Sequence, residues 1–411
     1  HEHTFDSGLT LVTESIKETN TVAINWGVQG GVAYNEFDGD SAILSELVKR
    51  GAQGLSAKEH NDALDLLGIR RQVSCGIEFF RVSGIMLGSH FTKGFPLLGS
   101  YLINPTLPEL DIDACKNLVL QSLQSLADNP SHLVGVALSK HHHPSPYNRS
   151  SYGNASDISS ATIGRLRDVY NNTFCPRGSI LAISGSIDHQ QVVNIVGESA
   201  DSWQKTPELN PQEGNTDRGV HWIEHDSSQI HIGLAFDAPN ASDSNAILET
   251  VAVSVFGGAT SGRLFTEVRQ RRSLCYSVSA QFAPSRTRSL VRMRAGTTPE
   301  RADETIRVCV DQLNQLRNGI SEEEFSRTIH RLKSRTVMGG ESTSARANSL
   351  WGDQYSLGYA RSLELRLKEL EEVSLVDVNN WLKKRLFGEL TLVYLGPNEI
   401  KLPDSLLSLD D

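Results

Sequence analysis

The chain of 411 residues is too long for one small hydrophobic core, and a prior of about 150 residues per domain indicates two domains. A composition with 38% hydrophobic and 21% charged residues excludes a disordered or fibrous protein. The net charge of -10 is spread along both halves, which excludes a nucleic-acid surface because such a surface needs a concentrated basic face.

The first half alternates strands and helices. Residues 8–12 and 21–28 are rich in strand-forming side chains and flank a charged turn, which predicts a hairpin. Apolar residues at helical spacing predict a helix over 40–49, and a second helix is expected over 58–67. A strand pair over 72–86 follows.

The two halves end alike. A predicted helix at 163–171 leads into the apolar strand 179–185, and a helix at 376–386 leads into the strand 390–396, each strand closing on glycine. This repeat predicts an internal duplication. Between the copies, residues 206–219 are polar, rich in Pro, Gly and Asn, and lack apolar periodicity, which is typical of an interdomain linker.

These boundaries give an N-terminal domain over 1–205, a linker over 206–219 and a C-terminal domain over 220–411. Each domain is predicted to have an α+β fold, with an antiparallel sheet and helices on one face.

The longest apolar runs fall far short of the roughly 20 residues that a membrane-spanning helix needs, so no transmembrane segment is expected. The cysteines are odd in number and never closely paired, which favours free buried thiols at Cys75, Cys115, Cys175, Cys275 and Cys309.

Three stretches resemble motifs of one peptidase family. Gly8–Val12 looks like the family's opening Asn-Gly-Leu strand, with Ser7 where Asn is usual. The stretch Phe256–Phe265 is similar to its Gly-Gly, Ser-Arg-Leu-Phe segment, and Glu267–Val278 is similar to Val-Arg-Glu-Lys-Arg-Gly-Leu-Ala-Tyr-Ser-Val. Over essentially its whole length the sequence thus resembles the pitrilysin-family (inverted zincin) zinc peptidases of the processing-peptidase type. The resemblance implies two homologous domains that form one half of a metallopeptidase clamshell.

The metal motif of the family is missing. Active members carry H-x-x-E-H on a helix of the first half, where the two His bind zinc and the Glu polarises water. Counted from Lys49–Gly51, which resembles the motif's end, these positions hold Ala42, Ser45 and Glu46. The stretch 118–123 matches the helix that supplies a third, carboxylate ligand, and it contains no carboxylate. The resemblance therefore implies no metal or other cofactor in this chain, with zinc expected in a partner subunit.

The strand that receives substrate in active members has also changed. It aligns with Gly68–Cys75, which lacks the second Gly, the Asn and the Thr of the family pattern. The metal ligands, the base and the substrate strand of the family are therefore all replaced, while the motif of the second half, Phe256–Val278, is kept.

Two side chains of the second-half motif are the candidate catalytic residues. In the family its Arg and Tyr hold substrate and stabilise the charge that builds on the scissile carbonyl oxygen. By resemblance these are Arg269 and Tyr276, which would complement a partner's active site. The alternation of residues 275–282 leaves open a second interpretation, in which Tyr276 packs in the core.

Gly257 and Gly258 are weak candidates for binding peptide substrate, and a turn at a helix entry explains them as well.

Three consecutive histidines, His141, His142 and His143, invite a metal interpretation. They precede Pro144 and a stretch rich in Ser and Asn, and successive side chains of a strand or loop point apart. We therefore expect a surface loop, and we discount the terminal His1 and His3 in the same way.

The sequence thus predicts the noncatalytic subunit of a heterodimeric zinc metallopeptidase, inactive alone, whose homologous catalytic partner keeps H-x-x-E-H. This chain would supply Arg269, Tyr276 and half of the chamber wall, and would bind peptide substrate. Two alternatives stay open: a structural scaffold, like the core subunits of respiratory complexes that share this fold, and a homodimer that binds peptides without cutting them. We expect a soluble protein of bacterial-type cytoplasm or periplasm, although no pattern identifies the compartment.

Overall fold

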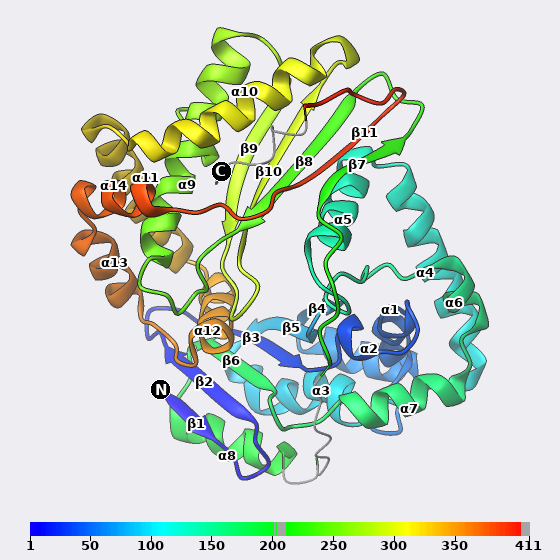
Figure 1. Ribbon diagram of the computed structural model, residues 1–411. Coiled ribbons are helices and arrows are strands. Elements are labelled where there is room, and N and C mark those ends of the chain that lie inside the picture. The colour runs from blue at the N-terminus through cyan, green and yellow to red at the C-terminus, as the bar shows by residue number, and fades with distance from the viewer. Residues whose placement is uncertain (201–202, 204–210, 404–411) are drawn as a thin grey trace. The chain divides into compact units, whose positions relative to one another are not determined.

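The computed structural model describes residues 1–200, 203 and 211–403 (Figure 1). The chain forms two compact units, each built around one β-sheet. Unit 1 comprises His1–Ser125, Ser145–Gly214 and Gly339–Ala360, and unit 2 comprises Leu126–Pro144, Asn215–Met338 and Arg361–Asp411. No helix of the described part is long and apolar enough to cross a membrane.

Unit 1 contains a six-stranded sheet of order β1-β2-β6-β3-β5-β4. Its strands are β1 (Glu2–Thr4), β2 (Thr10–Ser15), β3 (Thr21–Val28), β4 (Arg70–Cys75), β5 (Phe80–Leu87) and β6 (Ile180–Gly185). Its helices are α1 (Asp40–Leu47), α2 (Ala57–Leu66), α3 (Phe91–Ile103), most of α4 (Ile112–Ala127), α6 (Ala155–Ser160), α7 (Ile163–Thr173), α8 (His189–Ala200) and α12 (Thr343–Leu357).

Unit 2 contains a five-stranded sheet of order β7-β11-β8-β10-β9. Its strands are β7 (Gly219–Glu224), β8 (Ile230–Asp237), β9 (Ser277–Ala283), β10 (Leu290–Thr297) and β11 (Thr391–Gly396). Its helices are α5 (Pro130–His142), α9 (Ala246–Gly257), the π-helix η5 (Phe265–Arg271), α10 (Ala302–Gln315), most of α11 (Glu322–Gly340), α13 (Leu363–Glu372) and α14 (Leu375–Lys384).

The two sheets share one topology. Apart from β1, the order β2-β6-β3-β5-β4 repeats as β7-β11-β8-β10-β9, and the repeated ends predicted from sequence become α7–β6 and α14–β11. In both sheets the last strand pairs parallel with the first strand of the repeat and antiparallel with the second. The α+β class is therefore confirmed, although each sheet is mixed. The predicted hairpin of residues 8–12 and 21–28 is wrong, because β6 lies between β2 and β3.

Each unit contains one helix from the opposite half of the sequence. Helix α12 packs on the sheet of unit 1 and α5 on that of unit 2, so the compact units differ from the continuous domains 1–205 and 220–411. Each helix packs over a glycine of a central strand. A Cβ added to Gly27 in β3 would lie 2.6 Å from Trp351 of α12, and a Cβ added to Gly233 in β8 would lie 2.9 Å from Val134 of α5. The sheets are therefore covered on both faces, not only on the one face that was predicted.

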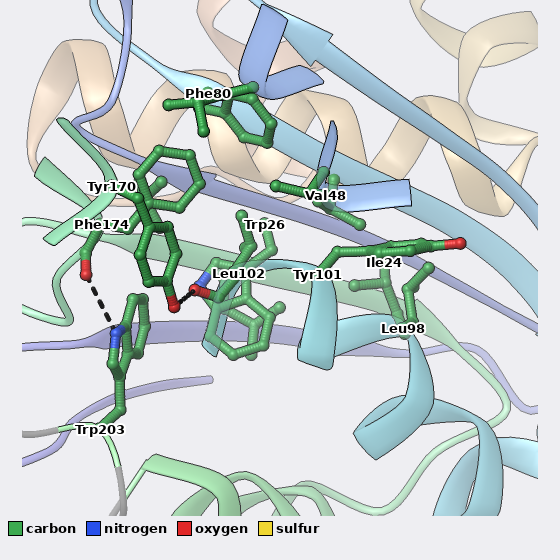
Figure 2. Packing of buried hydrophobic residues seen from close by; sticks show 14 of the residues in the cluster. Ile24, Trp26, Val48, Phe80, Leu98, Tyr101, Leu102, Tyr170, Phe174 and Trp203 are labelled. Atoms are coloured by element: carbon green, nitrogen blue, oxygen red, sulfur yellow. Dashed lines mark hydrogen bonds between the residues drawn. The ribbon is translucent and has the colours of Figure 1, made fainter. Parts of the chain in front are cut away.

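The largest core lies between the sheet of unit 1 and helices that include α1, α3, α7 and α8. Two of its aromatic side chains have partners for their polar atoms: the Tyr170 hydroxyl donates to the Leu102 carbonyl at 3.0 Å, and the Trp203 indole donates to the Phe174 carbonyl at 3.1 Å (Figure 2). Buried polar groups with partners cost little and fix the packing. All five cysteines are free thiols, as predicted; four are buried, whereas Cys75 is half-buried.

Candidate functional site

Helix α1, where the zinc motif of the family would lie, is fixed by a buried ion pair. Asp40 in its first turn is 1% exposed and accepts from Arg165 of α7, whose Nη2 lies 2.8 Å from Oδ1. Burial raises the pKa of Asp40, and the charge and hydrogen bond of Arg165 oppose that rise without cancelling it. The pair fastens the start of α1 to α7.

The three positions of the lost motif carry side chains that do not fit a zinc ion. Ala42 is buried and has no ligand atom. The Ser45 hydroxyl donates to the Ala42 carbonyl at 2.7 Å, so it is used within the helix. Glu46 forms an ion pair with Lys49 at 2.7 Å. Since a zinc site needs at least three protein ligands, α1 has no set of residues that would hold the metal.

The neighbouring positions have changed in the same direction. Gln121 and Ser122 stand where α4 would supply a carboxylate, and both are exposed. Strand β4 within the predicted substrate segment is an edge strand that pairs with β5, and α1 contacts it. An edge strand presents one row of backbone groups away from its neighbour, so the geometry for adding a peptide strand remains although the residues differ.

In unit 2 the arginine-rich stretch of η5 contains one guanidinium without a carboxylate partner. Glu267 pairs with Arg271 at 2.6 Å and with Arg272 at 3.0 Å. Arg269 is exposed, its guanidinium lies 4.9 Å from the centroid of the Phe265 ring, and it makes no ion pair with any described residue. A cation held over an aromatic face keeps its charge available for a further anionic group.

Tyr276 lies immediately before β9 and is 57% exposed. Its backbone N–H donates to the Gly296 carbonyl at 2.9 Å, while the side chains that enter the core are those of Leu274 and Cys275. The alternative that packs Tyr276 in the core is therefore wrong. Strand alternation misplaced it because the regular strand begins only at Ser277.

The turn between η5 and β9 is held by hydrogen bonds on both sides. The Leu274 N–H donates to the Val268 carbonyl at 2.9 Å, and the Thr297 hydroxyl and Arg301 side chain donate to the carbonyls of Leu274 and Ser273. Ser273 has φ 54, the left-handed region that favours glycine, and the family motif has glycine at this position. The backbone that carries Arg269 and Tyr276 is thus fixed.

Arg269 and Tyr276 lie at the two ends of this turn. Burial raises the pKa of the Cys275 thiol, and the positive charge of Arg269 opposes that rise. Cys275 directly precedes Tyr276 in the chain. The predicted pair therefore belongs to one exposed region of unit 2.

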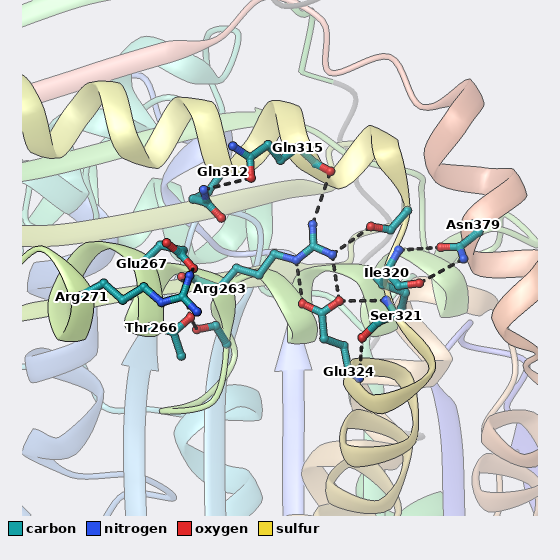
Figure 3. Close-up of polar contacts among 12 residues, drawn as sticks. Arg263, Thr266, Glu267, Arg271, Gln312, Gln315, Ile320, Ser321, Glu324 and Asn379 are labelled. Carbon is teal, nitrogen blue, oxygen red and sulfur yellow. Dashed lines mark hydrogen bonds and ion pairs between the residues drawn. The ribbon is translucent and has the colours of Figure 1, made fainter.

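Arg263, a motif residue to which the sequence assigned no role, anchors the start of η5. Its guanidinium binds both carboxylate oxygens of Glu324 at 2.8 Å and donates to the Gly319 carbonyl at 2.8 Å (Figure 3). Burial acts to raise the pKa of Glu324, but Arg263 and the Ser321 N–H outweigh it and hold the pKa below its ordinary value of 4.5. The planar fork positions the motif against the turn before α11.

Gly257 and Gly258 close helix α9 and do not form the entry of a helix, so that interpretation is wrong. Gly257 is buried, and a Cβ there would lie 2.5 Å from the Ala280 nitrogen in β9. This close approach of helix to strand accounts for the glycine. A role for either residue in binding peptide stays a prediction.

The predicted surface loop at His141, His142 and His143 is also wrong. Helix α5 begins at Pro130 and runs to His142, and the side chain of Asn129, the residue before it, accepts from the His132 N–H. His142 is buried, and its Nδ1 lies 2.9 Å from the Thr391 hydroxyl. An Asn-Pro pair is a helix-start signal, and it was present in the sequence.

Comparisons with known proteins agree with this geometry. Residues 160–332 match the family model described as the peptidase M16 inactive domain. An uncharacterized zinc protease of Mycobacterium tuberculosis strain H37Rv is 26% identical over 420 residues, covering 99% of this chain and 95% of that protein. The zinc protease YmxG of Bacillus subtilis, also uncharacterized, is 22% identical and covers 96% of this chain and 98% of its own length.

Solved structures show the same fold. A peptidase M16 inactive domain from Pseudomonas fluorescens superposes with a TM-score of 0.87 at 20% identity, covering 98% of this chain and 99% of its own. A protease from Helicobacter pylori gives 0.87 at 17% identity, covering 96% and 98%. The chain is therefore similar to zinc proteases along nearly its whole length, has the fold of the M16 inactive-domain structures, and carries other residues at the three positions of the metal motif, as a noncatalytic relative of the M16, or pitrilysin, peptidases would.

Proposed function

We propose that this chain is the noncatalytic subunit of a heterodimeric zinc metallopeptidase and completes the active site of a homologous subunit that keeps H-x-x-E-H. One contrast supports the proposal. The motif positions of α1 hold Ala42, Ser45 and a Glu46 already paired with Lys49, whereas Arg269 and Tyr276 stay exposed on a fixed turn.

The two exposed groups suit a role in a partner's site. A guanidinium and a phenol both donate hydrogen bonds, and in the complex they would donate to the carbonyl oxygen of the peptide as negative charge builds there. The partner would supply the zinc ion and the general base. Removing one such donor costs about 2 to 4 kcal/mol of transition-state stabilisation in related chemistry.

Burial of these donors in a complex would strengthen the hydrogen bonds that they make. In solvent, an exposed guanidinium interacts weakly with a carbonyl dipole because water screens the charge. Exclusion of water by the partner would raise the strength of the same hydrogen bond several-fold. Arg269 and Tyr276 would therefore have no activity alone, which agrees with a subunit that works only when paired.

The test is reconstitution. The chain, an M16 homologue with an intact motif, and their mixture are purified and assayed on a fluorogenic peptide library, and complex formation is followed by size-exclusion chromatography with light scattering. We expect no turnover by this chain, a 1:1 complex, and turnover by the complex well above that of the homologue alone. Turnover by this chain alone would contradict the proposal, as would a complex no more active than the homologue.

A further inference from the structure

Three potential metal ligands meet in unit 2, at residues that take no part in the α1 motif or the Arg269–Tyr276 turn. They are His141 at the end of α5, Asp217 just before β7, and His221 within β7. One ligand atom from each lies within 4.8 Å of the others, and no other group of three is found among the described residues. Segments from two distant parts of the sequence therefore build the cluster.

Both imidazoles direct a nitrogen toward Asp217. His141 Nδ1 lies 2.8 Å from the Asp217 carboxylate oxygen Oδ2, and His221 Nε2 lies 2.8 Å from the Asp217 carbonyl oxygen. The two rings stack with centroids 3.5 Å apart and planes 16° from parallel. Each imidazole thus already directs one nitrogen toward Asp217, and rotation of the rings and of the Asp217 side chain would bring the three ligands around one ion.

The backbone holds the cluster together before any ion binds. The Asp217 N–H donates to the His141 carbonyl at 3.1 Å, which joins the segment before β7 to the end of α5. His141 and His221 are partly buried, while the Asp217 side chain is 73% exposed and free to reorient. Lys140 is the neighbouring positive charge that opposes a cation, and Arg218 is engaged by Asp237 at 2.6 Å.

We propose that His141, Asp217 and His221 bind one divalent transition-metal ion of the zinc type. Two imidazoles and one carboxylate are ligands that zinc and cobalt accept, whereas magnesium and calcium require a shell of oxygen ligands. Binding would replace the hydrogen bonds that both imidazoles make to Asp217 by bonds to the metal. The proton on each ligand nitrogen would move through solvent to the other nitrogen of the same ring, so both imidazoles would bind in the neutral form. The fourth position would hold water.

Such an ion would act as a staple. Helix α5 is the one segment that the first half of the chain contributes to unit 2, and its end lies beside the start of β7 at this cluster. Metal bonds between His141 and His221 would join the two segments, and binding to the folded state alone raises stability with ligand concentration. The site rests on residues other than those of the proposed peptidase function.

The test is a titration of the tag-free protein, stripped with EDTA, with Co²⁺ and Zn²⁺. A His3→Ala background removes a competing ligand near the N-terminus. We expect one equivalent of Co²⁺ to give visible d–d absorption, Zn²⁺ to displace it and raise the melting temperature, and Mg²⁺ to do neither.

Three variants locate the site. We expect His141→Ala and His221→Ala to weaken Co²⁺ binding at least tenfold. Asp217→Asn, a change of nearly equal size at a side chain that is 73% exposed, should weaken it also. His330→Ala on the exposed face of α11 is the matched control and should bind as the parent. Absence of saturable Co²⁺ binding, or equal binding by the cluster variants and the control, would overturn the proposal, and neither result bears on peptide turnover.

Discussion

Helices α1 and α9 occupy the same place in two sheets of equal strand order, yet they lead to different surfaces. Each carries a buried carboxylate paired with an arginine from near the end of its half: Asp40 with Arg165 in unit 1, and Glu249 with Arg385 in unit 2. The Trp381 indole also donates to Glu249 at 2.9 Å. The framework that holds the helix is therefore present twice.

What differs is the set of polar groups left available. In unit 1 the side chains of the former metal positions are apolar, used within the helix, or paired. In unit 2 the segment after α9 leaves Arg269 and Tyr276 exposed on a pinned turn. The comparison teaches that a duplicated fold keeps its packing in both copies, while the polar groups that it leaves exposed differ between them.

The largest expected effect concerns the two buried ion pairs. Arg385→Ala leaves Glu249, which is 2% exposed, without its charged partner, and should lower the free energy of unfolding by about 3 to 5 kcal/mol. Arg165→Ala should cost less, because the Arg165 side chain is 18% exposed and water can reach it. Urea unfolding followed by tryptophan fluorescence measures both losses. Equal losses of unfolding free energy would contradict the expected difference in burial between the two ion pairs.

A smaller effect is expected at the anchor of the motif in unit 2. Arg263→Ala should cost about 1.5 to 3 kcal/mol, because it removes two charge-assisted hydrogen bonds to Glu324. The matched Arg271→Ala, at an exposed i,i+4 pair, should cost under about 0.5 kcal/mol.

The stability lost in Arg263→Ala should depend on pH. Since the pKa of Glu324 is held below 4.5 in the folded protein, the stabilisation is fully present above pH 4.5 and is lost as the pH falls below it. The difference in stability between the parent and Arg263→Ala should therefore shrink in acid. A constant difference between pH 7 and pH 3.5 would contradict this assignment.

Packing between α9 and β9 gives the third prediction. Gly257→Ala places a Cβ against the Ala280 backbone and should destabilise the protein by about 1 to 3 kcal/mol. Gly352→Ala in α12 meets no atom within 4 Å and should stabilise by about 0.5 to 1 kcal/mol. Thermal unfolding separates the two, and a neutral Gly257→Ala that weakens peptide binding would instead favour the substrate role.

The smallest effect is expected at the turn. Ser273→Gly relieves a left-handed conformation and should stabilise the protein by up to about 1 kcal/mol, the gain being reduced by the greater freedom of glycine in the unfolded chain. The melting temperature should rise slightly. A clear fall would mean that the Ser273 side chain makes a contact that outweighs the strain.

Much of the fold followed from local patterns, and the rest depended on packing over long distances. The helix starting at Asp40, the pair β4–β5 and the repeated α7–β6 and α14–β11 ends lie where periodicity predicted them. The exchange of α5 and α12 did not follow, because the amphipathic pattern of a helix does not say which sheet it covers. The insertion of β6 between β2 and β3 is non-local in the same way.

The candidate site divides along the same line. Ala42, Ser45 and Glu46 were found by counting positions along one helix, and such short spacings can be read directly from a single sequence. The exposure of Tyr276 depended on where β9 begins, and strand boundaries are poorly marked in sequence. The cluster of His141, Asp217 and His221 joins residues about 80 positions apart, so no spacing rule revealed it.

The central claim is that unit 2 supplies donors to a partner's active site, and one measurement tests it most directly. Peptide turnover is measured for the reconstituted complex with the parent chain, Tyr276→Phe, Arg269→Ala and the control Arg271→Ala. We predict that kcat/KM falls by about 30-fold to 1000-fold for the first two variants, equivalent to about 2 to 4 kcal/mol, with complex formation and the control unchanged. Full activity of both Tyr276→Phe and Arg269→Ala in an intact complex would contradict the account and leave a structural scaffold in its place.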